Sequence, residues 1–134
     1  MAAAAAKGWI VVAALSAAIA IAVGAFSAHG VDPSTEAGRK AREWLQTGSQ
    51  YELIHALAIL AVVVLVRGTM LNGRIALAAQ CLFLAGSVFF PGALYVLAFG
   101  GPRWLGAVAP LGGTAFILGW LSVVLAAVMN SDAD

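Results

Sequence analysis

The titratable residues within or beside long apolar stretches are the first candidates for chemistry in this chain. Glu52 and His55 are three residues apart, so on a helix they share one face, where a carboxylate and an imidazole can pair or bind one ion. His29 follows an earlier apolar stretch. Because a titratable group is costly in hydrocarbon, such residues mark candidate functional sites.

The Glu-x-x-His spacing also occurs in di-metal carboxylate bundles, which need two such motifs and two further carboxylates on facing helices. The other long apolar stretches contain no Asp or Glu, which argues against a di-metal site. One ion held by His29, Glu52 and His55 is an alternative without a specific spacing motif. The other alternative is a structural role, in which Glu52 interacts with the N-terminal dipole of its helix and His55 forms a hydrogen bond across the bundle. We favour the structural role and expect no metal and no other cofactor.

The composition places the chain in a membrane. Of its 134 residues, 63% are hydrophobic and 10% are charged, and the mean hydropathy of +0.98 is far above that of soluble domains. A net charge of +1 argues against nucleic acid as a partner. The single cysteine, Cys81, excludes an intrachain disulfide. With no Ser-His-Asp set and no phosphate loop, we expect a protein that is not an enzyme.

Four apolar stretches are long enough to cross a bilayer, at about residues 9–27, 49–67, 75–99 and 108–129. Short connections between the last three make neighbouring spans antiparallel. The chain is therefore predicted to be an all-α membrane protein, one integral membrane domain over residues 1–134, with four transmembrane helices in an antiparallel up-down bundle. The first stretch also has signal-peptide features, but it is longer than a usual signal core, which favours a retained span.

The connection between the first two spans has an amphipathic pattern. At about residues 33–47, Ala37, Ala41, Trp44 and Leu45 recur at helical spacing, and charged residues fill the other positions. This predicts a short surface helix anchored by Trp44, although the segment could equally run into the second span as one bent helix.

The basic residues divide almost evenly between the two sides of such a bundle. One side has three and the other has four: Lys7, Arg67 and Arg74 against Arg39, Lys40, Arg42 and Arg103. Three of the latter four lie in the predicted surface helix, so we expect both termini to be cytoplasmic.

An up-down bundle gathers the unusual polar residues at one membrane face, where the first and third spans end and the second and fourth begin. The candidate polar pocket at this face consists of His29, Tyr51, Glu52, His55, Tyr95 and Thr114. Two irregular segments fall at the same end, Pro91-Gly92 and Gly112-Gly113. Proline lacks a backbone donor and predicts a kink, and the glycines favour close helix packing over a cavity.

Small residues also recur at spacing four, which lets helix backbones approach closely. The sets are Ala14-Ala18-Ala22, Ala20-Gly24-Ala28 and Ala115-Gly119. They favour a compact bundle, and they are compatible with a homo-oligomer or a place in a larger complex.

Four groups of residues occur in the order seen in the YgdD family, which the chain resembles over nearly its whole length. They are Gly24-Ala25-Phe26-Ser27-Ala28-His29; Gln46-Thr47-Gly48 with Tyr51 and His55-Ala56-Leu57-Ala58-Ile59-Leu60; Gly92-Ala93-Leu94-Tyr95; and Pro110-Leu111-Gly112-Gly113 with Gly119-Trp120. Members are small four-span bacterial inner-membrane proteins of unknown function, with similar proteins in eukaryotes. The resemblance implies a fold, a topology and the bacterial inner membrane, but no reaction.

The chain departs from the family pattern at two positions. Pro91 stands where a small polar residue is more common, and Glu52 stands where glutamine is common. The second departure argues against a metal or proton role for Glu52 as a family property.

Three functional hypotheses follow. The leading one is a non-enzymatic accessory or scaffold component that packs with other membrane proteins or with lipids. The alternative is binding or transport of a small ligand, a proton or a quinone-like or lipid headgroup in a pocket around His29, Tyr51, His55 and Tyr95. The least favoured is a metal-dependent membrane enzyme.

Overall fold

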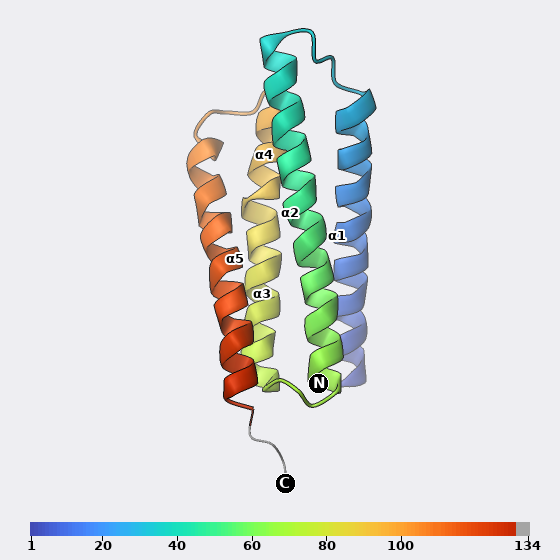
Figure 1. Ribbon diagram of the computed structural model, residues 1–134, viewed down its shortest axis with the longest axis vertical. Coiled ribbons are helices and arrows are strands. Elements are labelled where there is room, and N and C mark those ends of the chain that lie inside the picture. The colour runs from blue at the N-terminus through green and yellow to red at the C-terminus, as the bar shows by residue number, and fades with distance from the viewer. Residues whose placement is uncertain (131–134) are drawn as a thin grey trace.

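The computed structural model describes residues 1–130, which form an all-helical bundle (Figure 1). Its helices are α1 (Ala3–His29), α2 (Glu36–Arg67), α3 (Gly73–Phe89), α4 (Pro91–Ala98) and α5 (Leu105–Val128). Because α3 and α4 follow each other along one rod, four rods are long and apolar enough to cross a membrane. The predicted all-α architecture with four membrane-spanning helices is confirmed.

The four rods run antiparallel, with the start of α1 and the end of α5 at the same end (Figure 1). α2 packs against α1 on one side and against α3 and α4 on the other, while α5 packs against α3 and α4. α2 is accordingly the most buried rod and α1 the least buried. Side chains that project from α2 can therefore contact α1, α3 and α4.

In place of a separate surface helix over residues 33–47, the structure has one uninterrupted helix from Glu36 to Arg67. The Thr35 side chain caps it by accepting a hydrogen bond from the Gly38 amide at 3.0 Å. No proline lies between Glu36 and Arg67, and extending an existing helix costs less free energy than starting a new one. At 1.5 Å per residue α2 is about 48 Å long, so its first turns extend beyond a hydrocarbon core of about 30 Å.

The contact between α1 and α2 depends on small side chains at intervals of seven. Ala6, Ala13, Ala20 and Ser27 are the buried residues of α1. A repeat of seven keeps one narrow face of a helix against its neighbour, and small residues there allow close approach. α1 is thus attached along one seam, and its opposite face points outward.

The third rod breaks at Phe90. α3 ends at Phe89, and Pro91 is the first residue of α4, where a missing N–H group costs no helical hydrogen bond. Gly112 of α5 packs closely against this break, because a Cβ atom at that position would lie 2.6 Å from the Phe90 Cβ. The break lies about one turn before Tyr95.

The apolar core occupies the half of the bundle nearer the termini. It includes Ile59 and Val62 of α2, Phe83 of α3 and Phe116 of α5. At the end of the bundle, the Asn72 amide donates to the Ala126 carbonyl at 2.9 Å, which fastens the α2–α3 loop to α5. Of the polar candidates, His55 borders this core, because its ring lies against Phe83 and Phe116.

Candidate functional site

A single carboxylate links three helices in the interior. Glu52 of α2 is only 7% exposed. Its Oε1 accepts a hydrogen bond from the Ser16 hydroxyl of α1 at 2.9 Å, and its Oε2 accepts one from the Tyr95 hydroxyl of α4 at 2.6 Å. Both carboxylate oxygens are thus occupied by donors from neighbouring helices, an arrangement that stabilises a buried acidic group.

Local sequence explains how Tyr95 reaches Glu52. Tyr95 comes one turn after Pro91, on the short helix α4 that begins at this proline. Gly48, one turn before Glu52, provides the necessary space, because a Cβ atom there would lie 2.6 Å from Cε1 of the Tyr95 ring. Ser16 lies three residues after the buried Ala13, close to the α1 seam.

His55 belongs to a second, aromatic group. Its side chain is 4% exposed and stacks on Phe116 of α5 with ring centroids 3.5 Å apart. Nδ1 lies 2.7 Å from the Tyr51 carbonyl oxygen, and Nε2 accepts a hydrogen bond from the Trp120 indole N–H at 3.2 Å. Since a carbonyl can only accept and an indole can only donate, these contacts require a neutral imidazole with its proton on Nδ1.

The six residues of the predicted polar pocket do not line one common pocket in the structure. Glu52 and Tyr95 bond each other, and His55 bonds the backbone of Tyr51. His29 is exposed at the end of α1.

Thr114 of α5 is also exposed, and its hydroxyl donates to the Pro110 carbonyl of its own helix at 2.9 Å. Over residues 1–130, no group of three or more His, Cys, Asp or Glu residues could hold a metal ion. The predicted residues therefore form two hydrogen-bonded pairs and leave His29 and Thr114 apart.

The four predicted kink and packing residues also differ in their surroundings. Pro91 starts α4, and Gly112 packs against the backbone at Phe90. Gly92 has the Ser87 carbonyl oxygen 4.0 Å from an added Cβ atom, whereas Gly113 has open space around it.

Three polar residues outside the predicted pocket either donate a hydrogen bond to it or are buried. Ser16 and Trp120 donate to the two predicted titratable groups. Gln80 of α3 is fully buried, and neither of its amide atoms has a hydrogen-bond partner within residues 1–130. Trp120 belongs to the Gly119-Trp120 motif shared with the YgdD family. The spacing of residues along the sequence did not predict that it bonds His55.

A cleft of about 500 Å³ lies beside the aromatic group, between α2 and α5. It is lined by Tyr51, Ile54, His55, Phe90, Gly113, Phe116, Ile117 and Trp120. Its walls are aromatic and aliphatic, and Tyr51 and Trp120 are both partly exposed in it. Such a lining suits an apolar or flat ligand better than a charged one.

Outside the spans, the α1–α2 loop contains one titratable group with a shifted pKa. The Asp32 carboxylate accepts hydrogen bonds from the Ser34 amide and the Ser34 hydroxyl, both at 2.8 Å. These bonds favour the charged form and lower the pKa of Asp32 below its ordinary value.

Comparison with known proteins gives a consistent result. Residues 23–113 match the family described as "Protein of unknown function (DUF423)". The chain is 39% identical over 125 residues to the UPF0382 membrane protein YwdK of Bacillus subtilis, covering 91% of this chain and 97% of that protein. It is 36% identical over 115 residues to a UPF0382 membrane protein of Haemophilus influenzae, covering 86% and 89%.

The chain is also 37% identical over 120 residues to the UPF0382 inner membrane protein YgdD of Escherichia coli, covering 89% of this chain and 88% of that protein. No solved structure matches the chain. The resemblance to the YgdD family that the sequence motifs indicated is confirmed. The chain belongs to the DUF423 family of membrane proteins, whose function is unknown.

Proposed function

We propose that this protein is a non-enzymatic accessory or scaffold component of the bacterial inner membrane, which packs against other membrane proteins through its outer helix faces. The observation that carries the proposal is the outward face of α1. Ala14, Ala18 and Ala22 are exposed on the side of α1 opposite its seam with α2. Alanines at spacing four allow another transmembrane helix to approach closely.

The interior polar residues support a structural role for the titratable groups. Both oxygens of Glu52 and both ring nitrogens of His55 have hydrogen-bond partners within the protein. Groups used in this way hold helices together, and interhelical hydrogen bonds in membranes are a known source of such stability.

Purification from native membranes in a gentle detergent, followed by mass spectrometry, tests the proposal. We expect a second membrane protein in stoichiometric amount with the wild type. Ala18→Leu adds bulk to the outward face of α1 and is expected to remove this partner, whereas Ala127→Leu, the same change on the exposed side of α5, is expected to retain it.

Three results would overturn the proposal: a wild type recovered without any partner protein, a partner that survives Ala18→Leu, or a partner lost equally from both variants. The yield and helix content of each variant show whether it has folded. A recovered second copy of this chain alone would replace the accessory role with self-association.

We infer that both termini face the cytoplasm. On the opposite side of the bundle, Arg39 donates to the Pro33 and Ser34 carbonyls of the α1–α2 loop, and Arg42 donates to the Ala28 carbonyl in the last turn of α1. The side with the termini presents Lys7, Arg67 and Arg74, which favours that side as the inner one. Labelling of single cysteines at positions 34 and 69, in a Cys81→Ser background, with a membrane-impermeant maleimide is expected to modify only position 34 in intact cells.

A second candidate function is the binding of a flat, apolar ligand such as a quinone headgroup in the cleft between α2 and α5. The specific observation is the set of aromatic walls formed by Tyr51, Phe116 and Trp120 beside the His55 ring. A short-chain quinone would raise the melting temperature of the wild type and not of Trp120→Ala. Equal shifts in Trp120→Ala and in the control Trp104→Ala, which is outside the cleft, would count against this function.

A further inference from the structure

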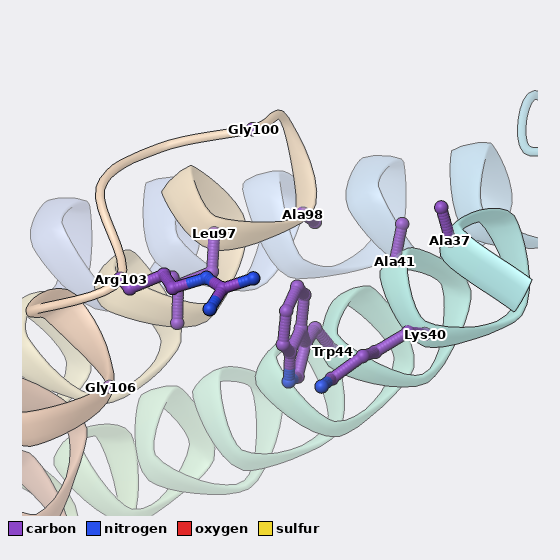
Figure 2. Close-up of a pocket in the computed structure, with 9 residues that line it drawn as sticks. All are labelled: Ala37, Lys40, Ala41, Trp44, Leu97, Ala98, Gly100, Arg103 and Gly106. Atoms are coloured by element: carbon purple, nitrogen blue, oxygen red, sulfur yellow. The ribbon is translucent and has the colours of Figure 1, made fainter.

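A second pocket, of about 580 Å³, lies between the first turns of α2 and the loop that joins α4 to α5 (Figure 2). Figure 2 shows Arg103 extending from that loop toward Trp44, with Lys40 beside the same indole ring. The Lys40 Nζ atom lies 5.2 Å from the Trp44 ring centroid. Gly100, at a φ of +84°, gives the loop a turn that favours glycine and leads it to Arg103.

The two cations of this pocket have no acidic partner. Within residues 1–130, neither Lys40 nor Arg103 has a carboxylate oxygen within 4.0 Å. Their neighbours on α2 do have backbone partners, since Arg39 donates to the Pro33 and Ser34 carbonyls and Arg42 donates to the Ala28 carbonyl of α1.

The nearest acidic residues on α2 are Glu36 and Glu43, four positions before and three positions after Lys40. They flank Lys40 on the helix but do not line the pocket. The pocket therefore has positive charge on two opposite walls, which favours a ligand with an anionic group.

The position of the pocket along α2 limits the source of that anion. About 20 helical residues cross the hydrocarbon core, so a span that starts at Arg67 reaches the other boundary near Gly48. Trp44 lies one turn beyond this boundary and Lys40 two turns beyond it, at the level of lipid headgroups. Trp and Lys side chains are common at this depth.

The pocket has both a charged part and an apolar part. Lys40 and Arg103 stand on its walls, while Ala41, Leu97 and Ala98 provide apolar lining. A phospholipid places its phosphate at headgroup level and its acyl chains toward hydrocarbon, so it complements both parts, whereas a soluble phosphate complements only the cations.

We propose that this pocket binds the phosphate of an anionic phospholipid from the leaflet opposite the termini. Lys40 and Arg103 donate hydrogen bonds to the phosphate oxygens, and the Trp44 ring packs against the glycerol part of the lipid. The site is separate from the outward face of α1 and does not depend on the proposed accessory role.

Native mass spectrometry of the detergent-solubilised full-length protein tests the site, with phosphatidylglycerol as the probe and phosphatidylcholine as the neutral comparison. The wild type is expected to bind phosphatidylglycerol more tightly. One basic residue near an anionic lipid contributes about fivefold in affinity, so Lys40→Gln/Arg103→Gln should weaken binding by about 25-fold. Arg67→Gln/Arg74→Gln removes the same charge at the other end and should weaken it by less than about threefold.

Three results would overturn the proposal. They are equal binding of the two lipids by the wild type, equal weakening in both double variants, and displacement of phosphatidylglycerol by water-soluble glycerol 3-phosphate at equal concentration, which would make the source a soluble phosphate. Arg103→Lys keeps the charge and should retain affinity within about threefold. Arg103→Gln alone should lose about fivefold, and this contrast with Arg103→Lys keeps the test decisive if Lys40→Gln/Arg103→Gln does not fold.

Discussion

The Tyr95 hydroxyl and the Glu52 carboxylate are 2.6 Å apart, across 43 positions of the chain. Together with Ser16, they form a buried contact between α1, α2 and α4. A carboxylate in the interior of a membrane protein is costly, and here two hydroxyl donors offset part of that cost. The most unusual acidic residue of the sequence thus has a structural explanation.

Removing the donors one at a time should measure their contribution. Tyr95→Phe and Ser16→Ala are each expected to lower the free energy of unfolding by about 0.6 kcal/mol and by no more than about 1.7 kcal/mol, the mean and the maximum for interhelical hydrogen bonds in a membrane protein. The double variant should lose more than the sum, because Glu52 then has no donor. Reversible unfolding in mixed micelles measures this loss.

Tyr51→Phe is the control for this series, since the structure shows no hydrogen bond from the Tyr51 hydroxyl within residues 1–130. It should unfold like the wild type. A double variant as stable as the wild type would mean that the Glu52 contact does not hold the helices together.

Two glycines of α5 form a second matched pair. A Cβ atom at Gly119 would lie 2.6 Å from Cε1 of the buried Phe83 ring, whereas one at Gly113 would have nothing within 4 Å. Overpacking in a tight core costs about 1 to 3 kcal/mol, while alanine in place of an unhindered helical glycine gains up to about 1 kcal/mol. Gly119→Ala should therefore melt below the wild type and Gly113→Ala at or above it; the reverse order would refute this packing.

Thr69, in the α2–α3 loop, has a positive φ of 58°. The left-handed region costs an L-residue about 1 to 2 kcal/mol, and a β-branched side chain is especially unfavourable there. Thr69→Gly should raise the free energy of unfolding by about 1 kcal/mol. Thr69→Ala, which keeps the Cβ atom, should gain less, and equal gains in both variants would argue against backbone strain.

Asp32 should titrate below its ordinary pKa of 3.8, because Ser34 donates two hydrogen bonds to the charged form. Because folding lowers this pKa, Asp32 stabilises the folded protein at pH values above its ordinary pKa of 3.8. This contribution is lost as the pH falls through the lowered pKa of the folded state. NMR titration of the Asp32 carboxyl carbon measures the midpoint, and Ser34→Ala should raise it. A wild-type midpoint at or above 3.8 would contradict the two hydrogen bonds.

Much of the fold follows from the sequence for direct physical reasons. Apolar stretches long enough for a bilayer predict the four rods, and a proline within one of them predicts the break that occurs at Phe90. The continuity of α2 was one of two open alternatives, because an amphipathic segment before a span can be helical on the surface or in line with that span.

The partners of the polar residues were not predictable in the same way. Topology places His29 and Glu52 toward the same end, but contact also depends on depth and on helix rotation. His29 is at the exposed end of α1, whereas Glu52 lies inside, facing α1 and α4. A serine such as Ser16 carries no sequence signal of which helix it faces, since that depends on the packing register of the seam.

Quantitative co-purification from native membranes tests most directly whether the protein acts through its outer surface or through its buried polar residues. The measured quantity is the molar ratio of partner to this chain for the wild type, for Ala18→Leu and for His55→Gln, each purified as folded protein. An action through the outer face of α1 predicts that His55→Gln keeps the wild-type ratio and that Ala18→Leu loses the partner. A partner lost with His55→Gln and kept with Ala18→Leu would contradict it.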